Sequence, residues 1–442
     1  MLWWGIGVAV GGGIGVAGYV VTKRARQTRA YLTSNRFPEF VRRDVDSDTI
    51  GIPVFTYHSV ATPHTPDSVT PQAFEHHLQY LKRNGYHTLT ADELHAHLVF
   101  GERVPPKSVV LTFDDGRATL WTIAYPLLKK YEMRAVCFLV PGAMTAEGVR
   151  PHIGDAPEQI DDLANADVGD APVITWAETR LMHESGIIDF QSHTRDHALI
   201  YCGPEIVDFA NPHSDYGYGG YALPLRRCHG EDVRDIPALG TPIYRSMPRM
   251  GAARRYYDDE RLRQACVAHV AENGGAQFFE RGNWRDTLSA FVKRYRHEHG
   301  DDGRYESPDE QRAAIHDSLV SSKQMIEEHL PGHIVRHLCY PWHRYSIMAA
   351  SLAIESGYVS TFVDINHHKL EPTWNAPYAV QHAIPVNTVG DDPYLITRID
   401  SRDDLILSLP GEGRLTMNQR IRARMLRVPQ RIKRLYANAR SV

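Results

Sequence analysis

Residues 109–116 read VVLTFDDG, and this stretch decides the fold. Five uncharged residues precede Asp114 and Asp115, and Gly116 follows them. An apolar run of this kind predicts a strand buried on both faces, as in a parallel sheet. Asp-Asp pairs occur at five other places in the chain, but none of them follows such a strand. Because functional groups of parallel α/β folds gather at the carboxyl ends of strands, we interpret this pair as a candidate site. An acidic first turn of a helix is the simpler alternative.

A second apolar run, residues 187–191, leads to two histidines four positions apart, His193 and His197. An isolated His-x-x-x-His is a weak signal, but this one also follows a predicted buried strand. If the two strand ends lie at the same edge of the sheet, Asp115, His193 and His197 form a two-histidine, one-carboxylate metal site. Such a site keeps coordination positions open for water and substrate. The other histidine clusters lack this context, and we interpret them as solvated.

From residue 51 onward, segments with strand character alternate with segments of helical periodicity. Thr70 and Pro71 predict a helix start, with threonine as the N-cap and proline at the first helical position. The other expected helices cover residues 92–100, 120–131, 176–185, 309–330 and 347–356. The expected strands cover residues 52–57, 108–113, 135–140, 187–191, 337–340 and 359–363. This alternation predicts a parallel sheet, either open or closed into a barrel.

Residues 201–307 interrupt the alternation. The first part of this stretch is rich in Gly, Pro, Tyr and Arg, and we interpret it as loop. Two helices are expected after it, near Glu260–Glu272 and Trp284–Arg296. We therefore expect a largely helical insertion on one face of the barrel.

The composition is that of an ordinary globular protein: 442 residues, 43% hydrophobic and 23% charged, with a net charge of −4. Residues 1–29 and 414–442 hold basic side chains and no acid, so the middle of the chain is strongly acidic. An acidic body argues against nucleic-acid binding, whereas basic ends fit an anionic membrane surface. The five scattered cysteines include no Cys-x-x-Cys, so neither a disulfide framework nor a cysteine zinc site is indicated.

Residues 1–29 predict a transmembrane anchor with a basic flank. The run from Trp3 to Val21 has no charge and is about long enough to span a bilayer, and Lys23–Arg29 follows it. The positive-inside rule then places the body in the cytoplasm, as a single-pass membrane protein. A Gly-x-Gly-x-x-Gly pattern at residues 13–18 lacks the second strand that a dinucleotide site requires. Residues 413–442 predict a basic amphipathic tail that binds a membrane surface or packs on the body.

Several segments resemble motifs of the polysaccharide deacetylase family, the NodB-homology enzymes of carbohydrate esterase family 4. The first two motifs are TFDDG at 112–116 and SHTRDH at 192–197, and IPVFTYHSV at 52–60 resembles the opening strand of the permuted branch that includes poly-N-acetylglucosamine deacetylases. WAE at 176–178 and YPW at 340–342 continue the match. The resemblance implies a deformed (β/α) barrel formed by residues 51–200 and 308–400.

The resemblance also implies roles for matched residues. Asp114 is expected to be the general base and His58 the general acid. Asp115, His193 and His197 are expected to bind one divalent metal ion, with zinc expected first and cobalt, nickel or manganese as alternatives. Many family members have an arginine at the position of Cys339, where it orients the base. A thiol cannot form that ion pair, and Arg195 and Arg344 are the candidates to replace the missing arginine.

The resulting hypothesis is a metal-dependent hydrolase that removes an N-acyl group, such as acetyl, from an amino sugar in a polysaccharide or a lipid-linked glycan. A deformylase or another linear amide hydrolase on the same scaffold is a second hypothesis. A carbohydrate-binding homologue without catalysis is a third, and Cys339 is its only support. The expected partners are the glycan or glycolipid substrate and the membrane, and no nucleic acid.

Overall fold

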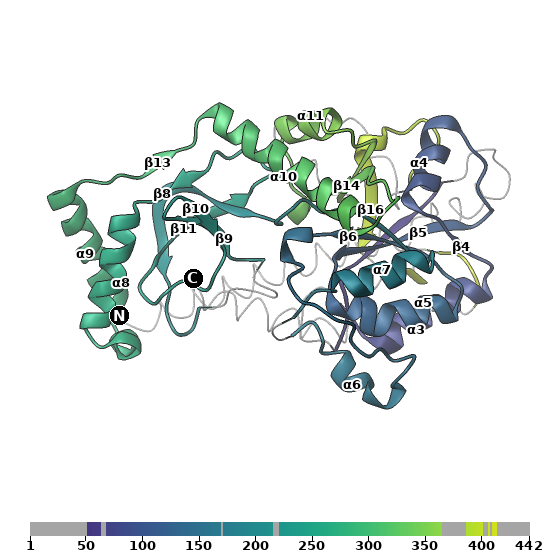
Figure 1. The fold of residues 1–442 in the computed structure, drawn as a ribbon, viewed down its shortest axis with the longest axis horizontal. Helices are drawn as coiled ribbons and strands as arrows, with labels where there is room; N and C mark the ends of the chain where they lie inside the picture. The colour runs from purple at the N-terminus through teal and green to yellow at the C-terminus, as the bar shows by residue number, and fades with distance from the viewer. Residues whose placement is uncertain are drawn as a thin grey trace, which may run out of the picture.

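The computed structural model describes residues 51–62, 68–168, 171–214, 221–364, 386–400, 405–406 and 409–412. Its centre is a closed barrel of seven parallel strands, in which the first barrel strand in sequence pairs with both the second and the last (Figure 1). The barrel strands, in their order around the ring, are β1 (Val54–Tyr57), β16 (Ile396–Asp400), β15 (Ser360–Asp364), β14 (His337–Cys339), β7 (Ile188–Ser192), β6 (Ala135–Leu139) and β5 (Ser108–Asp115). The predicted barrel is thus confirmed, and β16 is a strand that the sequence reading missed.

The register brings the carboxyl ends of neighbouring strands to one mouth of the barrel. Asp115 of β5 lies opposite Leu139 of β6, which lies opposite Ser192 of β7, which in turn lies opposite Leu338 of β14. Short strand β4 (His87–Thr88) extends the ring next to β5, and β2 (Ser59–Val60) pairs with β3 (Ser68–Val69) beyond β1. The residues directly after β5 and β7 therefore share the same mouth.

Helices surround the barrel, and their starts follow the expected capping chemistry. The Thr70 side chain accepts a hydrogen bond from the Ala73 amide, and Pro71 occupies the first position of α3. Reciprocal capping boxes begin α4, α7 and α10. The helices of the barrel are α3 (Pro71–Arg83), α4 (Ala91–Phe100), α5 (Tyr125–Lys130), α6 (Ile160–Leu163), α7 (Trp176–Glu184), α10 (Pro308–His329) and α11 (Ile347–Glu355).

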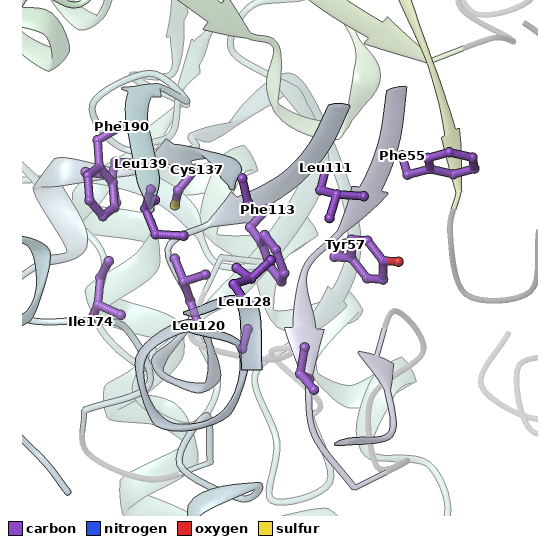
Figure 2. Close-up of a cluster of buried hydrophobic side chains, with 14 of the residues drawn as sticks. Phe55, Tyr57, Leu111, Phe113, Leu120, Leu128, Cys137, Leu139, Ile174 and Phe190 are labelled. Carbon is purple, nitrogen blue, oxygen red and sulfur yellow. The ribbon is translucent and has the colours of Figure 1, made fainter. Parts of the chain in front are cut away.

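Alternation along the strands divides the hydrophobic core of the barrel into two clusters. Figure 2 shows the larger one, in which Leu111 and Phe113 of β5 lie among side chains of neighbouring elements such as Leu120 and Leu128. Val110 belongs to a second cluster that also contains side chains of β6, β14, β15 and β16. Since side chains of a strand point alternately to opposite faces, Val110, Thr112 and Asp114 face the barrel interior.

The chain between β7 and β14 is only partly helical, so the expectation of a largely helical insertion is wrong in its first half. Both expected helices exist, as α8 (Glu260–Glu272) and α9 (Trp284–His299). The stretch interpreted as loop instead contains a four-stranded sheet in the order β10-β9-β8-β11, and strand β12, which pairs with β13 after α9. These strands are β8 (Leu199–Phe209), β9 (Pro224–Cys228), β10 (Glu231–Val233), β11 (Pro242–Pro248), β12 (Tyr256–Tyr257) and β13 (Arg304–Tyr305).

The glycine and proline of β8 explain the error. Gly203 and Pro204 stand inside the strand and predict a loop. They fall where the register between β8 and β11 shifts, which is the position at which an irregular ladder tolerates such residues. In Figure 1 this sheet and helices α8 and α9 lie to the side of the barrel, and α10 runs from them back to it.

The predicted membrane anchor at 1–29 and the predicted tail at 413–442 lie outside the described residues. Within the part of the chain that the structure describes, none of the helices combines the length and the apolarity that a membrane span requires.

Candidate active site

Asp115, His193 and His197 lie together at the mouth of the barrel. The Oδ1 atom of Asp115 is 3.6 Å from Nε2 of His193 and 3.5 Å from Nε2 of His197. All three residues are buried, and one ligand atom from each lies within 4.8 Å of the others. The structure therefore brings the three predicted metal ligands to one point.

The surroundings of these three residues fit a metal ion. Asp115 Oδ1 is buried and has no hydrogen-bond partner among the described residues, which is costly for a carboxylate oxygen unless a cation satisfies it. The carbonyl oxygen of Cys339 lies 2.8 Å from Nδ1 of His193. A proton on Nδ1 leaves Nε2 unprotonated and directed toward Asp115, as a metal-binding histidine requires. Burial lowers the pKa of His197 to about 3, so its ring is neutral and able to donate a lone pair at ordinary pH.

Strained backbone places these ligands. Asp115, Thr194 and His197 have φ values of 72°, 64° and 51°, in the left-handed region that most side chains avoid. Gly116 has a φ of 65°, and a Cβ atom there would lie 2.8 Å from Leu139 Cδ2. Glycine is favoured after the two aspartates, because a larger residue would be strained at this φ and would displace the end of the Leu139 side chain. Such strain persists where the surrounding fold enforces it, and it is concentrated at functional sites.

The predicted base, Asp114, forms an ion pair that the sequence reading missed. Arg398 of β16 donates from Nη1 to Oδ1 at 2.8 Å and from Nη2 to Oδ2 at 2.9 Å. Burial alone would raise the pKa of Asp114, but the charge of Arg398, with a smaller contribution from His193, holds it well below its usual range. The carboxylate is therefore ionised at neutral pH.

Neither of the two arginines expected to replace the missing one does so. Arg195 binds Asp196 and Asp317 instead, at 2.8 and 2.5 Å. Arg344 has no described contact with Asp114. Cys339 lies where the resemblance places it, with its Sγ 3.6 Å from Oδ2 of Asp114, and Arg398 reaches the same carboxylate from another strand.

His58, the predicted acid, follows β1 and lies on the open side of the site. Its Nε2 is 3.9 Å from Oδ2 of Asp114, and 28% of its side chain is exposed, against 2% for Asp114. Of the two predicted proton-transfer groups, Asp114 therefore lies on the buried side of the site and His58 on the solvent side.

Three further residues complete the site and were not expected from the sequence. Arg117 donates to Oδ2 of Asp115 from Nε at 3.1 Å and from Nη2 at 2.7 Å, which leaves Oδ1 for the metal position. Rings of Tyr221 and Trp342 lie on His197, with centroids 4.9 and 4.8 Å away. Trp342 belongs to the quoted YPW segment. Arg117 directly follows the first motif, and this position was the one feature of the sequence from which its role could have been predicted.

The fold and this site together form a closed parallel barrel with a candidate metal centre at one mouth. Residues 101–207 match the family model described as "Polysaccharide deacetylase", which confirms the predicted family for this part of the chain. Members of this family are hydrolases of carbon–nitrogen bonds other than peptide bonds.

Two curated proteins are similar over this region. YxkH of Bacillus subtilis (strain 168) is 34% identical over 113 residues, which are 26% of this chain and 38% of that protein. The poly-beta-1,6-N-acetyl-D-glucosamine N-deacetylase of Staphylococcus aureus (strain N315) is 30% identical over 129 residues, 29% of this chain. The chain spans 38% of the length of each of these relatives.

Solved structures resemble the chain over a longer stretch at low identity. A de-N-acetylase from Aggregatibacter actinomycetemcomitans gives a TM-score of 0.46 at 19% identity, covering 82% of this chain and 97% of that one. IcaB from Ammonifex degensii gives 0.43 at 16% identity, covering 80% and 94%.

Proposed function

We propose that this protein is a metal-dependent N-deacetylase that removes an acetyl group from an amino sugar in a polysaccharide or a lipid-linked glycan. The observation that carries the proposal is the convergence of Asp115, His193 and His197 beside an ionised, arginine-held Asp114. Among the described residues, the buried Oδ1 of Asp115 has no hydrogen-bond partner, and it lies beside Nε2 of both histidines. The proposed base, Asp114, is the next residue in the chain.

In this proposal, Asp115, His193 and His197 hold the metal ion, and zinc is the proposed metal. A divalent ion, when bound there, polarises the acyl carbonyl and acidifies water. Asp114 accepts the proton of the attacking water, and Arg398 keeps its carboxylate ionised and fixed in direction. His58 protonates the amine nitrogen as the carbon–nitrogen bond breaks, acting as the general acid.

The ion pair of Asp114 with Arg398 argues against a binding protein that has lost catalysis. The only support for that alternative was the replacement of the motif arginine by Cys339. Arg398 supplies a guanidinium to the same carboxylate with bidentate geometry. Intact ligands, base and acid are more than carbohydrate binding alone requires.

The test measures metal content and acetate release with the purified full chain. The wild type is expected to contain about one divalent ion per chain and to release acetate from β-1,6-linked N-acetylglucosamine oligomers or chitooligosaccharides. His193→Ala is expected to lose the metal and the activity together. The matched control is His299→Ala, at an exposed histidine of α9, which is expected to keep both.

Two results would overturn the proposal. Full metal occupancy in His193→Ala would refute the ligand assignment. Release of formate from N-formyl substrates, with no acetate from any N-acetyl glycan, would favour a deformylase on the same scaffold.

We propose in addition that residues 1–29 anchor the protein in a membrane with its catalytic domain in the cytoplasm. The basic residues after the apolar run support this orientation. A reporter fused after Val442 that is active only outside the cytoplasm would contradict it.

A further inference from the structure

The two carboxylate oxygens of Asp115 have different surroundings. Nε and Nη2 of Arg117 both donate to Oδ2, at 3.1 and 2.7 Å. Both side chains are buried, with 8% of Arg117 and 5% of Asp115 exposed. The other oxygen, Oδ1, lies 3.6 Å from Nε2 of His193 and 3.5 Å from Nε2 of His197. The arginine therefore holds the carboxylate by one oxygen, and the other oxygen faces the two histidines.

The backbone at Arg117 is anchored to the chain that precedes α7. Arg117 forms an antiparallel bridge with Val173, and the amide of Ala118 donates to the Pro172 carbonyl oxygen at 3.0 Å. A side chain that starts from a fixed backbone loses less conformational freedom when its end group is held. The guanidinium of Arg117 therefore approaches Asp115 from a defined direction.

Tyr221, from the chain between β7 and β14, packs on this arginine. Its side chain is buried, and its ring centroid lies 4.7 Å from Cζ of Arg117, the geometry of a cation–π contact. The same ring lies 4.9 Å from the ring of His197, and its hydroxyl lies 3.4 Å from the carbonyl oxygen of Asp115. The inserted region therefore contacts the arginine and two of the candidate ligands through one side chain.

A second buried pair, Arg249 with Glu306, shows what is particular to this one. Nη1 and Nη2 of Arg249 donate to separate oxygens of Glu306, so both oxygens of that carboxylate are used. In the pair of Arg117 and Asp115 both bonds fall on Oδ2, and Oδ1 has no hydrogen-bond partner among the described residues. An unsatisfied buried oxygen is costly, so this geometry favours a ligand-holding role over a purely structural one.

We propose that Arg117 is a positioning residue of the metal site: it binds Asp115 through Oδ2 and so presents Oδ1 to the ion, while Tyr221 holds the guanidinium in place. This inference rests on the proposed function, because it takes Asp115, His193 and His197 as the metal ligands. Groups that orient a metal ligand control metal affinity although they do not touch the ion. With one oxygen of Asp115 held by Arg117, the three ligands leave positions open for water and the acyl oxygen.

The test measures metal affinity and the absorption spectrum of bound cobalt with the purified full chain, so it does not depend on turnover. Zn²⁺ or Co²⁺ is added to metal-free protein in competition with a chelating dye. Arg117→Met is expected to raise the Kd for Zn²⁺ about 10- to 100-fold, the usual effect of losing a group that orients a metal ligand. The d–d absorption of Co²⁺ is expected to change, because Asp115 can then turn or bind through both oxygens.

Further variants separate positioning from packing. Arg117→Lys keeps the charge without the forked guanidinium and is expected to bind Zn²⁺ more tightly than Arg117→Met. Tyr221→Leu loses the ring contact and is expected to raise the Kd about 3- to 30-fold. Tyr221→Phe keeps the ring and is expected to change the Kd less than about threefold, because a 3.4 Å hydroxyl contact is a weak hydrogen bond.

Arg249→Met is the matched control, because it removes a similarly buried arginine from its carboxylate far from the metal ligands in sequence. It is expected to lose stability, as Arg117→Met does, and to keep the Kd and the Co²⁺ spectrum of the wild type. A loss of affinity in Arg249→Met as large as in Arg117→Met would reflect instability in general and would overturn the proposal.

The outcomes separate this inference from the proposed function. A wild type that binds no divalent ion would overturn the proposed metal site and this inference together. If the wild type binds Zn²⁺ and Arg117→Met has the same Kd and the same Co²⁺ spectrum, the inference alone is overturned, even where deacetylation is observed. A Kd that rises in Arg117→Met and in Tyr221→Leu, but not in Arg249→Met, supports the positioning role even if no N-acetyl substrate is hydrolysed.

Discussion

Two buried arginine–carboxylate pairs lie in different regions of the molecule and share nearly the same geometry. Arg398 and Asp114 at the mouth of the barrel are joined by hydrogen bonds of 2.8 and 2.9 Å. Arg249 and Glu306, where the chain returns from the inserted region to α10, are joined by two of 2.8 Å. Glu306 also accepts the amide proton of Arg255 at 2.7 Å.

The difference lies in what else each carboxylate faces. The carboxylate of Glu306 accepts hydrogen bonds from the Arg249 guanidinium and from the Arg255 amide, and its side chain is fully buried. Asp114 faces the thiol of Cys339 and the partly exposed His58, beside the proposed metal position. Two pairs of nearly equal geometry therefore have different roles. The pair of Arg249 and Glu306 fixes the connection between two regions, and the pair of Arg398 and Asp114 keeps the proposed base ionised at the proposed active site.

The largest expected effect separates the two adjacent aspartates at the mouth. Asp114→Asn removes proton acceptance but no metal ligand, so the metal and the fold are expected to remain while the rate falls about 10²- to 10⁴-fold. Asp115→Asn is expected to empty the metal site. Metal analysis and acetate release on both variants make the comparison. Loss of metal in Asp114→Asn, with retention in Asp115→Asn, would exchange the two roles.

The next prediction tests the comparison of the two pairs directly. Arg398→Met and Arg249→Met each leave a buried carboxylate without its guanidinium, and each is expected to cost about 3–5 kcal/mol of stability. Only Arg398→Met is expected to change the pH dependence of the rate. Without Arg398 the pKa of Asp114 rises, so the base is protonated sooner and activity is lost at a higher pH as the pH falls.

The measurements for these two variants are denaturant unfolding and pH–rate profiles. An unchanged profile in Arg398→Met would show that the ion pair does not control the base. A shifted profile in Arg249→Met would show that the pair at α10 is coupled to the chemistry, contrary to its surroundings.

A smaller effect is expected at a buried titratable group that has no opposite charge. His77 lies in α3, with Nδ1 2.9 Å from the Tyr57 hydroxyl, and burial lowers its pKa to about 4. The unfolded chain takes up this proton below the usual pKa of about 6.5, whereas the folded chain resists it. Stability is therefore expected to fall by about 3 kcal/mol as the pH drops from about 6.5 to 4.

Unfolding at several pH values checks this prediction. His77→Asn is expected to flatten the pH dependence. His76→Asn, at the exposed neighbour, is expected to leave it nearly unchanged and is the matched control. Parallel curves for the wild type and His77→Asn would contradict the assignment.

The smallest effect is expected at an exposed pair of the same chemical type. Arg285 on α9 donates to Asp208 at 3.0 and 3.1 Å, with 62% and 37% of the two side chains exposed. Asp208→Asn is expected to cost about 0.2–1 kcal/mol, because water screens the pair. The cost is expected to shrink further in 1 M salt. A loss as large as that in Arg249→Met would mean that burial is not the deciding difference.

Much of the barrel follows from local sequence signals. The apolar strands ending at Phe113 and near Gln191 and the threonine–proline helix start at Thr70 were all predictable from a few neighbouring residues. Where local signals conflict, prediction from the sequence fails. Gly203 and Pro204 predict a loop, but they lie inside β8, because its irregular pairing with β11 accommodates them.

The sequence by itself indicated the candidate site residues, because Asp114 and Asp115 end one strand of apolar composition and His193 and His197 come soon after another. Only the tertiary structure decided what surrounds them. Arg398 is 284 positions from Asp114, on a strand that closes the ring, and Tyr221 reaches the candidate metal position from the inserted region. Periodicity and capping act over a few turns of chain, whereas these contacts depend on barrel closure and strand register, which no short stretch of sequence encodes.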